Sequence, residues 1–296
     1  MIAVDWGTSS FRAYRLAADG RIEERREAPL GILSVAAHDF AAALEGQVGD
    51  WVSAGDAPVV MSGMIGSRQG WQEVPYAACP AGFDEIALGM KVVHWGKDRS
   101  AFIAPGVACF DASGIPDVMR GEEVQILGAL EEMASQSALI CLPGTHSKWV
   151  RVTDGRIVSF STHMTGEVYA LLREQSILSR LMTDDALTPH LFDQGVRRAR
   201  EAGGLLHHLF GVRSLGLFEQ IPAPGLASYL SGILIGHELA SAAPKAKAVD
   251  LLGSAQLTAL YASALRAAGI APRVLDPHAV ARGLFRLASN LPRSSI

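Results

Sequence analysis

The stretch VDWGTSSFRAYRLAADGRI, residues 4–22, contains the pattern that decides the fold. A short apolar run ends at Asp5, and a Gly-Thr-Ser-Ser turn follows it. Residues 10–17 then have the composition of a second strand, which closes at the hairpin signal Asp19-Gly20 before a third strand over residues 22–28. The stretch therefore predicts a strand–turn–strand unit with an acidic residue at the end of its first strand.

A second copy of the pattern, LPGTHSKWVRVTDGRI, occupies residues 142–157. Its Gly144 follows Gly7 by 144 − 7 = 137 residues, and both copies close on the tetrapeptide Asp-Gly-Arg-Ile. Because Asp-Gly turns are common, chance recurrence is the alternative explanation. The repeat favours a duplicated domain with two similar turns.

An Asp-x-Gly-Thr turn has the chemistry of a phosphate-binding turn. A tight glycine turn between two strands points successive backbone N–H groups into one concavity, where an anion can bind. Gly7 and Gly144 permit close approach of a phosphate, and Asp5 can hold the water shell of Mg²⁺. An ordinary β-hairpin is the competing interpretation of one such turn. Two turns facing each other would clamp the phosphates of ATP, with hydroxyl and amine donors from Thr8, Ser9, Ser10, Thr145 and Lys148.

The composition excludes several classes of protein. The chain has 296 residues, 49% of them hydrophobic and 19% charged, so a large core can form. The net charge is −4 and there is no long basic run, which argues against a nucleic-acid partner. Three isolated cysteines and the lack of a signal peptide at the start indicate a cytoplasmic protein. Residues 226–243 form the most apolar helical stretch, but polar residues interrupt it, so we expect a buried helix and no membrane partner.

Strand-like and helical segments alternate along the chain, which predicts an α/β protein. The region around residue 120 is the most natural domain boundary. Helices are expected over residues 38–51, 122–135, 256–268 and 278–289, and loops over residues 62–81 and 111–121. The adjacent His207 and His208 are expected on the surface of a helix, without metal-ligand spacing.

The layout resembles the sugar kinase/actin/Hsp70 ATPase superfamily, and longer segments resemble the 2-dehydro-3-deoxygalactonokinase family. The matching segments are DWGTSSFRAY, MSGMIGSRQGWQEVPYAACPA, DVMRGEEVQILGAL, LPGTHSKWV, FSTHMTGEVYALL, YLSGILIGHELA and LLGSAQLTALY. The resemblance implies an actin-like, ribonuclease H-like fold with an interdomain cleft. It also implies ATP and Mg²⁺ as cofactors. We expect an N-terminal domain over residues 1–120 and a C-terminal domain over residues 121–277, with a last helix near 278–292 packing back onto the first domain.

Two departures from the superfamily pattern matter. Pro143 stands where the second phosphate turn commonly has an acidic residue, so Mg²⁺ is expected to depend on Asp5 alone. The segment resembling the adenosine motif has one glycine, Gly253, followed by Ser254, where two glycines are common. The adenine contact is therefore less defined than the phosphate contacts.

The resemblance also implies a catalytic base. RGEEVQILG, residues 120–128, resembles the Gly-Asp-Gln helix start of related sugar kinases, in which the acid after glycine is the base. That acid is Glu122, with Glu123 as the alternative one residue away. Both lie in the first turn of a helix, where the helix dipole favours a carboxylate, and acidic caps without catalytic function are common there. Arg12 is expected to reach the transferring phosphate, or else to be a solvated strand residue.

The glycine-rich loop after residue 62 is expected to bind the sugar acid. Arg68 can hold a carboxylate with its planar guanidinium, although a solvated surface arginine is the alternative. Arg120 is the next candidate for this role. The full set of expected substrate contacts is Ser62, Gly66, Ser67, Arg68, Trp71, Arg120, Thr162 and Thr165.

The expected activity is ATP-dependent phosphorylation of the terminal 6-hydroxyl of 2-dehydro-3-deoxy-D-galactonate, giving the 6-phosphate and ADP in galactonate catabolism. A kinase for another small sugar acid, such as 2-dehydro-3-deoxy-gluconate, is one alternative. A catalytically silent sugar or nucleotide sensor of the same fold is another, but such a sensor is expected to lose Asp5 or Glu122, and both are present. A homodimer is an open expectation.

Overall fold

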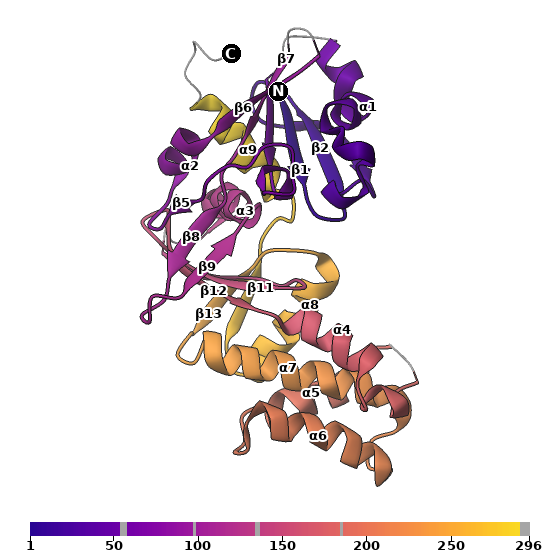
Figure 1. The fold of residues 1–296 in the computed structure, drawn as a ribbon. Coiled ribbons are helices and arrows are strands. Elements are labelled where there is room, and N and C mark those ends of the chain that lie inside the picture. Colours follow the sequence, from indigo (N-terminus) through magenta and orange to yellow (C-terminus); the bar gives the residue numbers. More distant parts are fainter. Residues whose placement is uncertain (54–57, 97–98, 134–136, 184–185, 291–296) are drawn as a thin grey trace. The chain divides into compact units, whose positions relative to one another are not determined.

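A computed structural model describes residues 1–53, 58–96, 99–133, 137–183 and 186–290 (Figure 1). The chain divides into two compact units. Unit 1 comprises Met1–Ser137, Arg151–Phe160 and Asp276–Ile296, and unit 2 comprises Ala138–Val150 and Ser161–Leu275.

Unit 1 extends past residue 120, where the sequence suggested a boundary, because two helices pack together within it. Helix α3 (Glu122–Ala129) lies so close to α9 (Ala279–Ser289) that a Cβ on Gly128 would overlap the carbonyl oxygen of Ala279. The described part of the last helix thus belongs to the first unit, while residues 291–292 lie outside the described residues. The expected helix over 122–135 ends earlier, at Ala129, and a 3₁₀ turn follows at Leu130–Glu132; residues 134–135 are likewise outside the described ranges.

A six-stranded sheet forms the centre of unit 1. Strands β1 and β2 are antiparallel, as are β2 and β3, whereas β4 pairs in parallel with β1 and with β7. The order is β3 (Ile22–Ala28), β2 (Phe11–Leu16), β1 (Ile2–Trp6), β4 (Val59–Ser62), β7 (Arg99–Ile103) and β6 (Lys91–Trp95). A smaller sheet has the order β5 (Ala77–Ala78), β8 (Val107–Phe110) and β9 (Pro116–Met119).

The five-stranded sheet repeats this order. It runs β12 (Arg156–His163), β11 (Ser147–Thr153), β10 (Ala138–Leu142), β13 (Ala248–Leu251) and β14 (Ala271–Val274). Most of this sheet belongs to unit 2, whereas residues 151–160 of its β11 and β12 are counted with unit 1. In the six-stranded sheet, β3, β2 and β1 are followed by β4 and β7, which pair in parallel. In the five-stranded sheet, β12, β11 and β10 are followed by β13 and β14, which also pair in parallel. The sequence repeat therefore corresponds to a structural duplication.

Helices complete both units. Unit 1 also contains α1 (Phe40–Ser53) and α2 (Phe83–Gly89), while unit 2 contains α4 (Thr165–Gln175), α5 (Pro189–Arg198), α6 (Gly204–Leu217), α7 (Leu226–Ala242) and α8 (Ala255–Ala267). Helix α7 is buried along most of its length, as expected for residues 226–243. Within the described ranges, none of the helices has both the length and the apolar character of a transmembrane segment.

The two faces of β1 pack against different parts of unit 1. Its even-numbered residues, Ile2, Val4 and Trp6, belong to a hydrophobic core that includes Leu44 and Val48 of α1. Because successive strand residues point to opposite faces, the side chain of Asp5 points to the other face of the sheet, where α9 contacts β1 and β4. The strand thus buries its apolar residues against α1 and places the carboxylate of Asp5 on the opposite face of the sheet.

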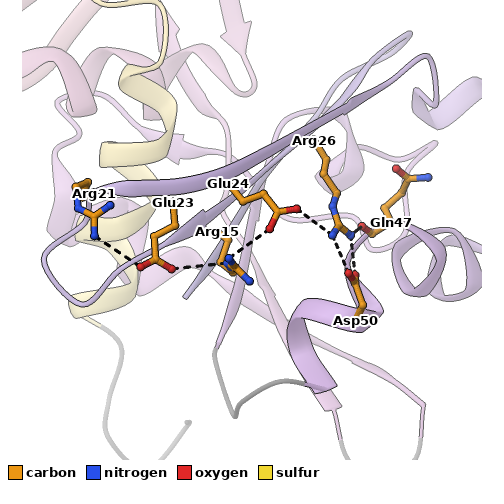
Figure 2. Close-up of polar contacts among 7 residues, drawn as sticks. All are labelled: Arg15, Arg21, Glu23, Glu24, Arg26, Gln47 and Asp50. Carbon is orange, nitrogen blue, oxygen red and sulfur yellow. Dashed lines mark hydrogen bonds and ion pairs between the residues drawn. The ribbon is translucent and has the colours of Figure 1, made fainter.

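The outer strand β3 carries an ionic network that protects the sheet edge (Figure 2). The guanidinium of Arg26 donates to both carboxylate oxygens of Asp50, at 2.6 and 2.7 Å, and to the carbonyl oxygen of Gln47 at 2.7 Å. It also lies 4.0 Å from the ring centre of Trp51. Charged side chains on an edge strand oppose pairing with another chain, so this face is unsuited to β-sheet association.

Two sequence expectations need correction. Residues 111–121 were expected to form a loop, but Pro116–Met119 form β9, which pairs with β8 across a turn at residues 111–114. The PDVM segment lacks the alternation that would have marked it. His208 was expected on a helix surface; it lies in α6 but is fully buried, and its Nδ1 is 2.9 Å from Nε2 of His237. Only the packing of α6 on α7 distinguishes it from the exposed His207.

Candidate active site

The first phosphate turn joins β1 and β2 in unit 1. The N–H of Gly7 donates to the carbonyl oxygen of Ser10 at 2.9 Å, and the carbonyl oxygen of Gly7 accepts from the N–H of Ile32 at 3.0 Å. Thr8 and Ser9 are exposed at its tip. The turn is therefore fixed at its base and open at its tip, as a turn that receives a phosphate must be.

Asp5 lies at the base of this turn and is almost fully buried. It is paired in register with Arg12 on β2 and with Ser62 on β4. Its Oδ2 is 3.6 Å from Nη2 of Arg12. Burial raises the pKa of Asp5, and the charge of Arg12 acts against that rise. Ser62 is fully buried, so its hydroxyl has no access to solvent in this structure.

Helix α3 begins beside Asp5 because two glycines permit close packing. Gly63 and Gly121 both have positive φ, 95° and 107°. A Cβ on Gly63 would lie 2.7 Å from the carbonyl oxygen of Trp6, and one on Gly121 would lie 3.2 Å from the Cα of Gly63 and 3.9 Å from Oδ1 of Asp5. Gly121, the residue that precedes α3, is thereby placed next to the carboxylate at the end of β1.

The two acidic residues at the start of α3 have different environments. Glu122 is partly exposed, and its Oε2 accepts from the N–H of Arg120 at 3.1 Å. Glu123 is fully buried; its Oε2 accepts from the N–H of Gly121 at 2.7 Å, and its Oε1 has no hydrogen-bond partner among the described residues. Burial, and then the charge of Glu122, raise the pKa of Glu123 well above its usual range. Only Glu122 is open to a substrate.

The two arginines considered for the carboxylate of the sugar acid differ in exposure. The side chain of Arg68 is 87% exposed, and its Nε is 3.5 Å from Oε1 of Glu73. Arg120 instead donates from Nη2 to the carbonyl oxygen of Val74 at 2.8 Å and lies 4.4 Å from the ring centre of Tyr76. Its buried Nε and Nη1 have no partner among the described residues.

The other expected loop residues are enclosed to different degrees. Gly66 adjoins Arg120, because a Cβ there would lie 3.0 Å from Nη1. The hydroxyl of Ser67 is buried and without a partner in the described part of the chain. Trp71 is half-buried and packs against the core of unit 1, so much of its ring is not available to a ligand.

The second phosphate turn joins β10 and β11 in unit 2, and helix α4 packs directly on it. A Cβ on Gly166 would lie 2.5 Å from the carbonyl oxygen of Gly144 and 2.8 Å from the Cα of Thr145. The N–H of Glu167 donates to the carbonyl oxygen of Thr145 at 3.0 Å, and the carboxylate of Glu167 bonds the ring of His146. Thr145 and His146 are exposed, so the tip of this turn is also open.

Lys148 and Thr162 lie below the turn. The ammonium group of Lys148 is mostly buried and donates to Oγ1 of Thr162 at 2.9 Å. Lys148 thus points into the unit in this structure, where the sequence suggested a contact with phosphate.

A cavity of about 500 Å³ adjoins the second turn. Its wall includes Gly144 and Thr165, and helix α8 contributes Gln256, Leu257 and Tyr261. Helix α8 starts at the adenosine-like segment, where Gly253 has φ 156° and Oγ of Ser254 accepts from the N–H of Leu257 at 3.4 Å. The predicted phosphate turn and the predicted adenosine segment therefore border one cavity, together with Thr165.

The duplicated sheets and their turns define a fold, that of the two-domain actin-like ATPases. A solved structure of an activator of 2-hydroxyisocaproyl-CoA dehydratase from Clostridium difficile, with bound ADPNP, has the same fold. Its TM-score is 0.51 at 12% identity, covering 98% of this chain and 94% of that one. At this identity the likeness shows the fold alone.

The family follows from closer relatives. The family model described as 2-keto-3-deoxy-galactonokinase matches residues 5–287, and the chain belongs to this family. A Rhizobium meliloti (strain 1021) protein named for 2-dehydro-3-deoxygalactonokinase activity is 40% identical, with 97% of this chain and 95% of the relative covered. The 2-dehydro-3-deoxygalactonokinase of Escherichia coli (strain K12) is 34% identical, with 90% of each covered. A crystal structure of a Sinorhizobium meliloti protein assigned to the same activity has a TM-score of 0.89 at 39% identity, covering 97% of both chains.

Proposed function

We propose that the protein transfers the γ-phosphoryl group of ATP to the terminal 6-hydroxyl of 2-dehydro-3-deoxy-D-galactonate. The observation that carries the proposal is the family match over residues 5–287, which spans both phosphate turns. The products are the 6-phosphate and ADP. Such a transfer needs little covalent chemistry from the protein, so catalysis consists of positioning the reactants and stabilising charge.

The nucleotide is assigned to the cavity of unit 2. Its volume of about 500 Å³ is in the range of small-molecule sites, and one wall is apolar side chains of α8. A nucleotide in this cavity would place its phosphates beside Gly144 and the exposed residues Thr145 and His146, while Leu257 and Leu260 offer apolar surface to the base. On the first turn, the exposed residues Thr8 and Ser9 offer their hydroxyl groups to phosphate oxygens.

Asp5, Arg12 and Glu122 are assigned to the transfer itself. Glu122 takes the proton from the attacking hydroxyl, because it is accessible whereas Glu123 is enclosed. Arg12, 38% exposed at its side chain, supplies positive charge to the transferring group.

Mg²⁺ fits at Asp5 through water. No group of three or more His, Cys, Asp or Glu side chains arranged for a metal exists among the described residues, so the protein would contribute few direct ligands. Mg²⁺ typically retains several waters and binds one or two carboxylates together with substrate phosphates, which matches a single carboxylate beside a phosphate turn. The ion would neutralise phosphate charge.

Arg120 is a stronger candidate than Arg68 for binding the carboxylate of the sugar acid. Tyr76 and Val74 fix the guanidinium of Arg120, and two of its nitrogens remain without a partner among the described residues. Arg68 is mostly solvated. We expect Arg120→Lys to raise KM for the sugar acid at least tenfold and to change KM for ATP little, because lysine lacks the planar fork. Arg68→Ala is the matched control; a larger effect there would return the assignment to Arg68.

ADP release measured against a panel of 2-keto-3-deoxy sugar acids tests the activity. We expect the highest kcat/KM with the galactonate epimer. A higher kcat/KM with the gluconate epimer would make that epimer the assigned substrate. The lack of turnover with any sugar acid would favour a sensor.

We also propose a homodimer formed through the outer face of α6. Leu206, Phe210 and Leu217 lie on one side of the helix and are 84%, 60% and 55% exposed, and Phe218 beside them is 77% exposed. Exposed apolar surface of this kind marks an interaction site, and a two-fold axis pairs one such face with itself. Light scattering should give the mass of a dimer for the wild type and of a monomer for Phe210→Glu. Leu88→Glu, at a 91% exposed position on α2, should remain a dimer.

A further inference from the structure

A buried chain of hydrogen bonds connects the second phosphate turn to the two helices behind it. Ser147, the first residue of β11, is fully buried, and its Oγ lies 2.8 Å from the hydroxyl oxygen of Tyr261 on α8. The hydroxyl of Tyr261 donates to Oε2 of Glu238 on α7 at 2.8 Å. The other oxygen of Glu238 accepts from Nε1 of Trp149 at 2.7 Å. Two residues of β11 are therefore connected to one carboxylate.

The direction of this hydrogen-bond chain follows from its chemistry. A carboxylate only accepts hydrogen bonds, so Trp149 and Tyr261 must both be donors to Glu238. Burial, and then the charge of Glu238, raise the pKa of Tyr261, which keeps its hydroxyl protonated. The tyrosine oxygen must then accept from Ser147. Each polar group thus has one defined role, which fixes the orientation of Ser147.

The location of the hydrogen-bond chain relates it to the proposed site. Ser147 follows the turn residues Gly144, Thr145 and His146 directly, while Tyr261 lines the 500 Å³ cavity together with Gly144. All four members are at most 4% exposed, and in such an environment a lost partner leaves a polar group unsatisfied. The hydrogen-bond chain therefore fixes the turn against the cavity wall.

We propose that Tyr261 and Glu238 are positioning residues, which hold the second phosphate turn in the geometry that phosphoryl transfer requires. The expected effect on kcat rests on the proposed function, whereas the expected effect on the position of the turn does not. The turn's exposed tip contacts the phosphates, and the buried hydrogen bonds below determine where that tip lies. A shift of the tip by about 1 Å can reduce turnover on the order of 10²-fold, so a loss of one hydrogen bond has a measurable effect.

The test compares three substitutions. Tyr261→Phe removes one hydroxyl and retains the ring. Glu238→Gln can keep every contact, since its amide oxygen accepts from Trp149 and its NH₂ donates to Tyr261, which then donates to Ser147. Glu238→Met removes both hydrogen bonds to the carboxylate, those from Trp149 and Tyr261. Tyr229→Phe is the matched control, because Tyr229 is a 3% exposed tyrosine of unit 2 in a separate hydrophobic cluster.

Hydrogen–deuterium exchange and kinetics give separate readouts. We expect Tyr261→Phe and Glu238→Met to speed amide exchange over residues 143–148 and to lower kcat by about tenfold. KM for the sugar acid should stay within twofold. Glu238→Gln should recover most of the wild-type kcat, and Tyr229→Phe should change neither readout even if its Tm falls.

Unchanged exchange in Tyr261→Phe, or Glu238→Gln as impaired as Glu238→Met, would overturn the inference. Faster exchange with an unchanged kcat would overturn it as well, because the role would then be structural only. If the wild type shows no turnover with any sugar acid, the proposed function fails, and the exchange data still decide whether the hydrogen-bond chain holds the turn.

Discussion

Gly166→Ala is the sharpest test of the contact between α4 and the second phosphate turn. The new Cβ would lie 2.5 Å from the carbonyl oxygen of Gly144, which is 0.9 Å short of ordinary contact at 3.4 Å. The nearest atoms that this Cβ would meet, in Gly144 and Thr145, all belong to the backbone, so no neighbouring side chain can rotate to relieve the overlap. Overpacking of this kind costs about 1–3 kcal/mol, and the gain from replacing a helical glycine offsets about 0.5–1 kcal/mol of it.

The expected net result is a loss of up to about 2.5 kcal/mol in the free energy of unfolding and a lower Tm. If the turn moves by about 1 Å to relieve the overlap, kcat should fall by 10-fold to 10²-fold. Gly46→Ala is the matched control, because Gly46 is a helical glycine of α1 and a methyl group added there would have nothing within 4 Å. It should gain about 0.5–1 kcal/mol and keep full activity.

Thermal denaturation and a coupled assay of ADP release measure both effects. The reasoning would be refuted if Gly166→Ala raised Tm as much as Gly46→Ala and kept the wild-type kcat. That outcome would mean that α4 and the turn can move apart without loss of stability or of kcat.

Three further predictions concern the acidic residues of unit 1. Asp5→Asn should lower kcat by on the order of 10²–10³-fold. It should leave Tm unchanged or higher, because burial raises the pKa of Asp5 and its charge is costly to bury. Near-normal turnover with Mg²⁺-ATP would contradict the assignment. Glu122→Gln should lower kcat by about 10²–10⁴-fold, with Glu123→Gln as the adjacent control, and a reversal of the two would move the base by one residue. Glu123→Gln should also change the pH dependence of stability. The pKa of Glu123 in the folded protein lies above its ordinary value of 4.5, so the folded state keeps a proton that the unfolded state loses, and stability from this group falls as pH rises above 4.5. The Tm of Glu123→Gln relative to wild type should therefore increase from pH 4.5 upward, and a constant difference would show that Glu123 does not titrate differently on folding.

The sequence indicated both phosphate turns because their determinants are local. A glycine and small hydroxyl residues between two strands predict a turn that can bind an anion, and the repeat at residues 7 and 144 indicated the duplication before any packing was known. The strands around these turns, and the helices beginning near residues 256 and 278, were predicted for the same reason. Their hydrophobic periods are properties of short segments.

The sequence could not distinguish residues whose environments depend on distant contacts. Arg68 and Arg120 are both arginines beside glycines, and only the position of Tyr76 and Val74 shows that one guanidinium is held and the other is solvated. Glu122 and Glu123 are likewise adjacent acids. Only the folded chain shows that Glu123 is fully buried and Glu122 partly exposed, and α9, on which α3 packs, begins 279 − 123 = 156 residues after Glu123.

What the sequence by itself determined is the chemistry available at each turn, because that chemistry resides in side chains and backbone groups a few residues apart. Only the tertiary structure decided which of these groups remain accessible and which are enclosed. Glu238 and Tyr261 follow Ser147 by 238 − 147 = 91 and 261 − 147 = 114 residues, and no local pattern records the hydrogen bonds that join them. Burial and hydrogen bonding between such residues exist only after the sheet and helices have packed, so the support behind the second turn is a property of the fold.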